Sequence, residues 1–149
     1  MPAARIFVDS NVLLYGRDEE TPLKAEASNR WLREAVAHNA IRANLQVLNE
    51  VTNVMLRKRA DLTAQEIFAA VDEIGFLGQT SVTNSTVRLS RAIRLKTGYS
   101  WWDCLLLASA LELGCTHFLS EDLQDGQVIE GLTIIDPFAH TPEQILTSR

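Results

Sequence analysis

The sequence predicts an α/β fold in which a central, mainly parallel sheet is covered by helices on both faces. Short apolar runs of strand length alternate along the chain with longer segments whose apolar residues recur at helical spacing. The first run, Ile6, Phe7 and Val8, has the length and the branched or aromatic content of a buried strand. The segment after Ser100 is apolar nearly all round, which predicts a helix at the centre of the fold.

The individual elements follow from periodicity and capping signals. Strands are expected at residues 6–8, 40–43, 80–83, 117–119 and 132–135. Helices are expected at residues 23–37, 44–59, 63–76, 84–96 and 101–113, with a short final helix after Thr141. Thr63 and Glu66 form a capping-box pattern at the start of the third helix, and Asn84 or Ser85 is expected to cap the fourth.

Length and composition place the chain among ordinary globular proteins. Its 149 residues fit one domain with a hydrophobic core, so we expect a single domain over residues 1–149. No apolar run approaches the roughly 18 residues needed to cross a bilayer. The first residues contain no apolar core of a signal peptide. We therefore expect a cytoplasmic protein with no membrane partner.

Charge and ligand-type residues narrow the function classes. The net charge of −5 argues against broad electrostatic adhesion to nucleic acid, although it permits a local basic groove and a site that concentrates negative charge. The two cysteines form neither a disulfide framework nor a C-x-x-C site, and Cys104 is expected in the core. The three histidines are far apart in sequence, which argues against a zinc site.

Asp9 directly follows the first predicted strand, at the edge where open α/β sheets bind their ligands. An ordinary alternative is an aspartate that caps a helix or a turn. Asn11 could orient the Asp9 carboxylate, or it could take part in the same turn chemistry. Asp122 follows the strand at residues 117–119 in the same way, with Glu121 and Asp125 nearby, and its alternative is a solvated acidic turn.

Two further acids lie on predicted helices. Glu50 falls on the edge of the apolar stripe of the helix at residues 44–59, where it could face a site or extend into water. Asp103 lies three residues after Ser100, so its carboxylate could serve as a helix cap. A buried carboxylate in so apolar a helix needs a partner, and either the cap or a metal ion would provide one.

These four acids can meet, because a parallel sheet brings its strand ends and the neighbouring helix faces to one crevice. Four carboxylates without paired cations would repel one another, and a divalent ion would neutralise them. Hard oxygen ligands select Mg²⁺ or Mn²⁺. Such ions commonly serve phosphoryl chemistry by holding a phosphate, activating a water and stabilising the leaving oxygen.

Four segments, in the right order over most of the chain, resemble the motifs of PIN-domain ribonucleases, and most closely those of VapC-type toxins of bacterial toxin–antitoxin pairs. They are Val-Asp-Ser-Asn-Val-Leu-Leu-Tyr at residues 8–15, Leu-Asn-Glu-Val at residues 48–51, Tyr-Ser-Trp-Trp-Asp-Cys-Leu-Leu at residues 99–106 and Leu-Ser-Glu-Asp-Leu-Gln-Asp-Gly at residues 119–126. The resemblance implies a PIN-like α/β/α sandwich and a metal-dependent endoribonuclease.

The resemblance also implies the roles of individual residues. The catalytic and metal-binding quartet would be Asp9, Glu50, Asp103 and Asp122, holding one or two Mg²⁺ or Mn²⁺ ions. Asn11 and Ser120 would support the site, and Asp125 would contact metal through water. A metal-activated water would attack the RNA phosphate in line and leave a 3′-hydroxyl and a 5′-phosphate. Such proteins are commonly homodimers held inactive by a cognate antitoxin, and tRNA or another structured RNA is one class of substrate.

Contact with RNA requires cations. The candidates are Arg57, in a basic cluster, and Arg88, Arg91 and Arg94, which recur every three residues on one helix. A solvated helix face is the alternative. Trp101 and Trp102 could stack on an unpaired base, but core packing or a dimer interface is the favoured interpretation.

Other functions stay open at this point. A haloacid-dehalogenase-like phosphatase also carries an aspartate after its first strand, but it needs a second aspartate where this chain has Asn11. A metal nuclease for structured DNA shares the acidic site, but the chain leaves little room for DNA-gripping elements. A PIN-like module that binds RNA or protein without catalysis is the alternative from a different class.

Overall fold

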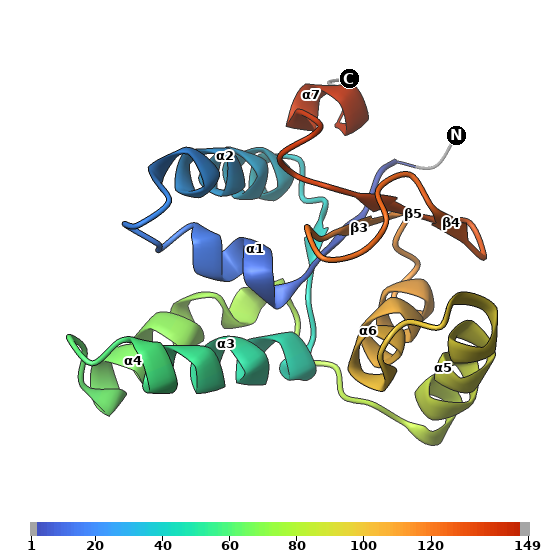
Figure 1. Ribbon diagram of the computed structural model, residues 1–149, viewed down its shortest axis with the longest axis horizontal. Coiled ribbons are helices and arrows are strands. Elements are labelled where there is room, and N and C mark those ends of the chain that lie inside the picture. The colour runs from blue at the N-terminus through green and yellow to red at the C-terminus, as the bar shows by residue number, and fades with distance from the viewer. Residues whose placement is uncertain (1–2, 147–149) are drawn as a thin grey trace.

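The computed structural model describes residues 3–146, and its centre is a sheet of five strands in the order β2-β1-β3-β5-β4 (Figure 1). The strands are β1 (Ile6–Val8), β2 (Ile41–Arg42), β3 (His117–Leu119), β4 (Val128–Ile129) and β5 (Leu132–Ile135). The first four in spatial order are parallel, and β4 pairs antiparallel with β5 at one edge. The predicted, mainly parallel sheet is confirmed.

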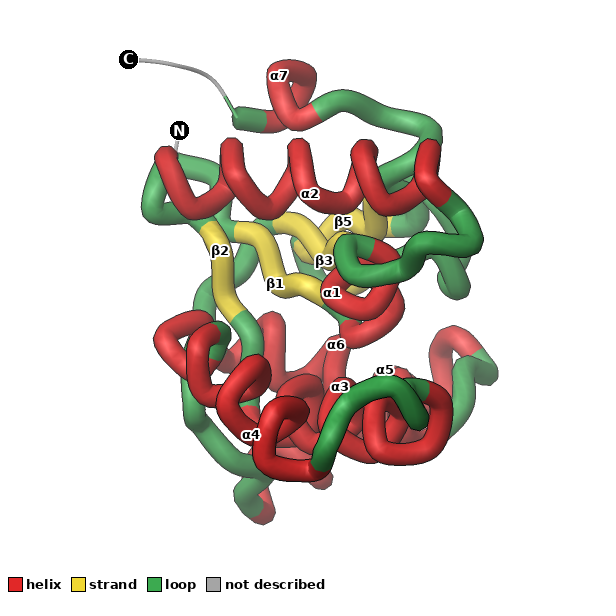
Figure 2. The backbone as a smooth tube through the Cα atoms, turned by 90° about the vertical axis from the view of Figure 1, so that its left-hand side faces the viewer, coloured by secondary structure: helices red, strands yellow, loops and turns green. Residues whose placement is uncertain are grey.

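Helices cover both faces of this sheet. They are α1 (Ser10–Tyr15), α2 (Pro22–Ala37), α3 (Leu45–Lys58), α4 (Ala64–Glu73), α5 (Asn84–Thr97), α6 (Trp101–Glu112) and α7 (Pro142–Ile145), with a 3₁₀ turn over Gly75–Leu77. Figures 1 and 2 show α2 and α7 above the sheet and α3 to α6 below it. The short α1 lies beside the strand ends, between α2 and α3.

Helix starts follow the capping signals in the sequence. Thr63 and Glu66 form the predicted capping box of α4. Ser100 caps α6, its hydroxyl oxygen accepting the Asp103 N–H at 3.1 Å. Helix α5 begins at Asn84, within the predicted range, but its capping residue is Thr83 rather than Asn84 or Ser85, so the predicted cap is wrong.

Three elements differ from the expectation. Residues 80–83 form no strand, so that prediction is wrong; the Thr80 carbonyl accepts the Leu45 N–H at 3.0 Å, which ties this exposed connection to the start of α3 instead of to a strand. The apolar run from Val12 to Tyr15 forms α1, because Asp9 caps a helix there. The two-residue strand β4 was not predicted, since a pattern so short carries no periodicity.

The core lies on both sides of the sheet. Phe7 and Phe118, on neighbouring strands, stack with their ring centroids 5.5 Å apart. Above the sheet, the buried Trp31 donates its indole N–H to the carbonyls of Pro137 and His140, which ties α2 to the segment before α7. Below it, α6 is buried from Cys104 to Ala110, as expected for a central helix. Among the helices of residues 3–146, none is long and apolar enough to cross a bilayer.

Candidate active site

The sheet register brings polar residues together at the carboxyl ends of the strands. Val8 pairs with Leu119, so Asp9 and Ser120, the residues that directly follow β1 and β3, lie side by side. The Asp9 N–H donates to the Leu119 carbonyl at 3.0 Å, which continues the ladder beyond the strand. Two residues separated by 111 positions in sequence are therefore placed at one edge by backbone pairing alone.

Asp9 is almost completely buried, with 4% of its surface exposed, and its two oxygens have separate partners. Oδ1 accepts the Ser10 N–H at 2.7 Å and so caps α1. Oδ2 accepts the Ser120 hydroxyl at 2.8 Å. The capping role weighed from the sequence is thus real, and it orients the carboxylate at the edge where a site was expected.

Burial makes the charged form of Asp9 costly. Desolvation, with smaller contributions from the negative charges of Glu50 and Asp103, raises the pKa of Asp9 from 3.8 to about 7, against the lowering effect of the Ser120 and Ser10 hydrogen bonds. A carboxyl group with this pKa is partly protonated near neutral pH unless a cation is present. A strongly shifted pKa at the edge of a sheet is typical of a functional group.

Glu50 reaches the same place from α3. Its Oε2 accepts the Ser10 hydroxyl at 3.0 Å, and its Oε1 accepts the Gln46 amide at 3.2 Å. Neither donor was predicted from the sequence. Gln46 lies one helical turn before Glu50, a spacing that could have identified it, whereas the Ser10 contact depends on how α1 packs against α3.

Asp103 enters from the first turn of α6. Its Oδ2 accepts the Ser100 hydroxyl at 2.9 Å, so serine and aspartate fix one another at the helix start. Partial burial raises the pKa of Asp103, the Ser100 hydrogen bond opposes this, and the charge of Asp122 adds to it. The charge of Asp103 in turn contributes to the raised pKa of Asp9.

Asp122 is held by the two residues predicted to support the site. Its Oδ2 accepts the Asn11 amide at 2.9 Å, and its backbone N–H donates to the Ser120 hydroxyl oxygen at 3.2 Å. Asn11 also donates to Ser120 at 3.4 Å. Ser120 therefore links Asp9 to the connection between β3 and β4, residues 120–127, which we call the Asp122 loop. This loop is also held at Gln124, whose N–H donates to the Tyr99 hydroxyl oxygen at 3.1 Å.

The donor set suits a divalent cation. Within residues 3–146, no three acidic, histidine or cysteine side chains lie close enough to hold one ion as they stand. The carboxylates nevertheless supply hard oxygen ligands, and the negative charges of their neighbours contribute to the raised pKa of Asp9 and of Asp103. Asn11 Oδ1 is also buried with no hydrogen-bond donor in the described structure, an oxygen that a hydrated cation would satisfy.

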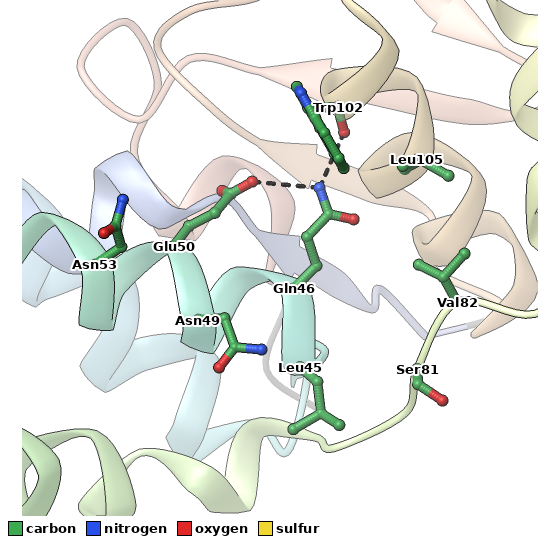
Figure 3. Close-up of a pocket in the computed structure, with 9 residues that line it drawn as sticks. All are labelled: Leu45, Gln46, Asn49, Glu50, Asn53, Ser81, Val82, Trp102 and Leu105. Atoms are coloured by element: carbon green, nitrogen blue, oxygen red, sulfur yellow. Dashed lines mark hydrogen bonds between the residues drawn. The ribbon is translucent and has the colours of Figure 1, made fainter.

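A groove of about 690 Å³ opens beside Glu50, between the start of α3 and the start of α6 (Figure 3). Gln46 spans it at one end, where its amide donates to Glu50 and, at 3.2 Å, to the Trp102 carbonyl. The site and the groove therefore share Glu50.

The neighbouring acids of the Asp122 loop have other contacts. Asp125 accepts the Asp136 N–H at 2.9 Å and His140 Nε2 at 2.8 Å, contacts that join the loop to the segment after β5. Glu121 pairs with Lys24 of α2. Neither makes a hydrogen bond to the four predicted acids in the part of the chain described.

Of the four arginines predicted to contact RNA, three are exposed without a described side-chain hydrogen bond and one, Arg94, binds backbone carbonyls. Arg57 lies exposed near the end of α3, and Arg88 and Arg91 are exposed on α5. Arg94 donates to the carbonyls of Gly98 and, at 2.7 Å, Tyr99. Its guanidinium thus stabilises the turn that leads to Ser100.

The family follows from a comparison with family models. Residues 6–124 match the model of the PIN domain, which is most of the chain. The chain belongs to the PIN-domain family, a family of nucleases, and the resemblance seen in the sequence is confirmed. A comparison with curated protein sequences finds no match.

Solved structures share the fold at low sequence identity. A toxin–antitoxin complex from Klebsiella pneumoniae aligns with a TM-score of 0.59 and 16% identity, over 90% of this chain and 98% of the other. VapBC2 from Rickettsia felis, bound to a DNA fragment from the promoter, aligns with a TM-score of 0.59 and 12% identity, over 87% of this chain and 96% of the other. At these identities the likeness establishes the fold.

Proposed function

We propose that this chain is a metal-dependent endoribonuclease and the VapC-type toxin of a toxin–antitoxin pair. One observation carries the proposal: within a PIN-domain fold, the buried Asp9 is linked through Ser10 to Glu50 and through Ser120 to Asp122. The fold supplies the nuclease class, and the arrangement of carboxylates supplies the chemistry.

Asp9, Glu50, Asp103 and Asp122 are the residues that would hold Mg²⁺ or Mn²⁺. When bound, such an ion supplies the positive charge that stabilises the attacking and leaving oxygens in phosphodiester hydrolysis. Four negative charges alone would repel a phosphate, so the cation is required for RNA to approach.

The other residues of the site fix the directions of these carboxylates. Ser10 and Ser120 hold the two oxygens of Asp9, and Gln46 holds Glu50. Asn11 holds Asp122. Because these donors are themselves placed by α1, α3 and the end of β3, the carboxylates are positioned before any ligand arrives, which lowers the reorganisation cost of the reaction.

RNA cleavage with and without metal tests this proposal. The wild-type chain is expected to cut RNA with Mg²⁺ or Mn²⁺, and EDTA should abolish the cut. Asp9→Asn should lower the rate by at least about 100-fold, because losing a metal ligand removes several kcal/mol of transition-state stabilisation. Asp72→Asn, an equivalent change at an exposed position on α4, is the matched control and should leave the rate unchanged.

Cleavage that persists in EDTA, or full activity in Asp9→Asn, contradicts the mechanism. A wild-type chain that binds RNA but cuts none with either ion would favour a non-catalytic binding module. Circular dichroism of each variant separates loss of activity from loss of fold.

The toxin assignment has its own test. Its support is the fold shared with two toxin–antitoxin complexes. We expect the adjacent gene to encode a small protein that binds this chain and suppresses its RNA cleavage, and we expect the chain to be a homodimer. Copurification and sizing by light scattering measure both. An active nuclease that no neighbouring product inhibits would contradict the toxin role and leave the nuclease role intact.

A further inference from the structure

The groove beside Glu50 has one wall of side-chain amides. Gln46, Asn49 and Asn53 follow one another at intervals of three and four residues along α3, so they line one side of the helix (Figure 3). The amides of Asn49 and Asn53 make no hydrogen bond to another group within residues 3–146, and both residues are exposed. These amides can therefore donate to and accept from a ligand.

The opposite wall is apolar and includes an exposed aromatic ring. Trp102, in the first turn of α6, has 64% of its surface exposed, and Val82 and Leu105 lie beside it in the groove (Figure 3). The Gln46 amide holds the Trp102 carbonyl at 3.2 Å, so the two walls are joined where the groove meets Glu50.

We propose that this groove is a binding site for one unpaired nucleobase, belonging to a nucleotide next to the scissile phosphate. The inference rests on the proposed nuclease function and extends it to the recognition of single-stranded RNA. Trp102 stacks on the face of the base, and Asn49 and Asn53 bind its edge. Sugar–phosphate connectivity requires such a base to lie beside the acids, and the groove begins at Glu50.

The chemistry of the groove fits a base better than a phosphate. Among the nine residues that line it, the one charged side chain is the acidic Glu50, which would repel a phosphate. A base is neutral, has a flat face for stacking and presents donors and acceptors at its edge. Aromatic stacking combined with amide hydrogen bonds is the usual means of binding unpaired bases in RNA.

The test measures RNA binding separately from cleavage. Short fluorescent single-stranded oligonucleotides are titrated against the wild-type chain with Ca²⁺ in place of Mg²⁺, and anisotropy gives the affinity. Ca²⁺ is a hard cation that carboxylates bind, but its larger, more flexible coordination suits hydrolysis poorly. Trp102→Ala should weaken binding about 10-fold to 100-fold, because one stacked base is lost. Trp102→Phe should keep most of the affinity. Trp101→Ala is the matched control, because Trp101 is 37% exposed and does not line the groove. This variant should bind within about twofold of the parent.

Oligonucleotides with a single abasic position identify the base. If Trp102 stacks on one base, removing that base from the oligonucleotide should weaken binding to the parent as much as Trp102→Ala does. Combining the abasic position with Trp102→Ala should reduce the affinity no further than either change alone. Asn49→Ala and Asn53→Ala should alter the preference among the four bases at that position by about tenfold.

Three outcomes would overturn the proposal. Equal RNA affinity for Trp102→Ala and its parent removes the subsite, and if the wild-type chain still cuts RNA, the nuclease proposal survives. If Trp102→Ala binds RNA normally but no longer binds the protein encoded by the adjacent gene, the groove is a site for that protein and not for a base. Absence of both RNA binding and RNA cleavage by the wild-type chain overturns the subsite and the proposed function together.

Discussion

Asp9 and Asp103 both lie at the start of a helix, but their surroundings differ. Asp9 is itself the cap of α1, is 4% exposed and has both oxygens engaged. Asp103 lies in the first turn of α6, is only partly buried and is held through one oxygen by Ser100. The pKa of both is raised, and the pKa of Asp9 reaches about 7.

This difference shows that one local motif can serve two purposes. Where the helix start is also the end of a central strand, as at Asp9, capping fixes a carboxylate in a site that water barely reaches. Where it faces a loop, as at Asp103, the same geometry mainly stabilises the helix and leaves the carboxylate partly hydrated. Asp9 is therefore the acid that depends most on a cation.

The largest expected effect is on the pH dependence of stability without metal. The Asp9 pKa is about 7 in the folded chain and about 3.8 when unfolded, so the folded state binds the extra proton between these values. The free energy of unfolding should therefore fall by up to about 4 kcal/mol as the pH rises from about 4 to about 7. It should stay at this lower value above about pH 7.

Urea denaturation in EDTA across this range measures the effect. Asp9→Asn should remove most of the pH dependence, because the neutral amide has no charge to desolvate. Asp103→Asn should retain most of it. Equal slopes in wild type and Asp9→Asn would refute the strong burial penalty at Asp9.

The next effect is stabilisation by metal. A bound divalent cation favours ionised carboxylates, so Mn²⁺ should stabilise the wild-type chain more at pH 8 than at pH 5. At a concentration 100 times the dissociation constant the gain is about 2.7 kcal/mol. Thermal unfolding with and without Mn²⁺ measures it. Asp9→Asn should lose the gain, while Asp72→Asn should keep it; a gain preserved in Asp9→Asn would place the ion elsewhere.

A smaller effect on stability and metal affinity is expected when either of two serines, Ser120 beside Asp9 or Ser100 beside Asp103, is replaced. Ser120→Ala removes a buried hydroxyl that donates to Asp9 and accepts from Asp122, so it should cost about 1–3 kcal/mol and lower metal affinity about 10-fold to 100-fold. Metal titration by calorimetry and urea denaturation test both values. An unchanged metal affinity would show that Ser120 does not orient the site.

The smallest effect is expected at Ser100, which is exposed and holds Asp103. Ser100→Ala removes the cap of α6 and should cost about 1 kcal/mol, with a weaker effect on metal affinity than Ser120→Ala has. The same two measurements apply. A larger loss of metal affinity for Ser100→Ala would reverse the ranking of Asp9 and Asp103.

Much of the fold was predictable because it rests on local signals. The Thr63–Glu66 capping box and the apolar run at Ile6–Val8 each specify their element without tertiary information. The strand predicted at residues 80–83 was wrong because its conformation depends on tertiary contacts. Their strand-like pattern has no neighbour to pair with, and the contact of Thr80 with the start of α3 decides their conformation.

The positions of the candidate acids in the fold could be predicted from the sequence, whereas most of their contacts could not. Acids at strand ends converge by topology, so Asp9 and Asp122 could be found from position. The hydrogen bonds of Ser10 to Glu50 and of Gln46 to Trp102 depend on the packing of α3 against α1 and α6, which no sequence pattern specifies. For the same reason, the contact of Asp125 with His140 could not be foreseen.

The central position of β1 has a consequence for synthesis of the protein. Asp9 leaves the ribosome early, but its partner Ser120 follows 111 residues later, and until β3 exists β1 can pair with β2 alone. Pairing of strands so distant in sequence is slow. The nascent chain thus holds scattered carboxylates until Ser120 and Asp122 have been synthesised, and under the proposed function it cannot cut RNA before then.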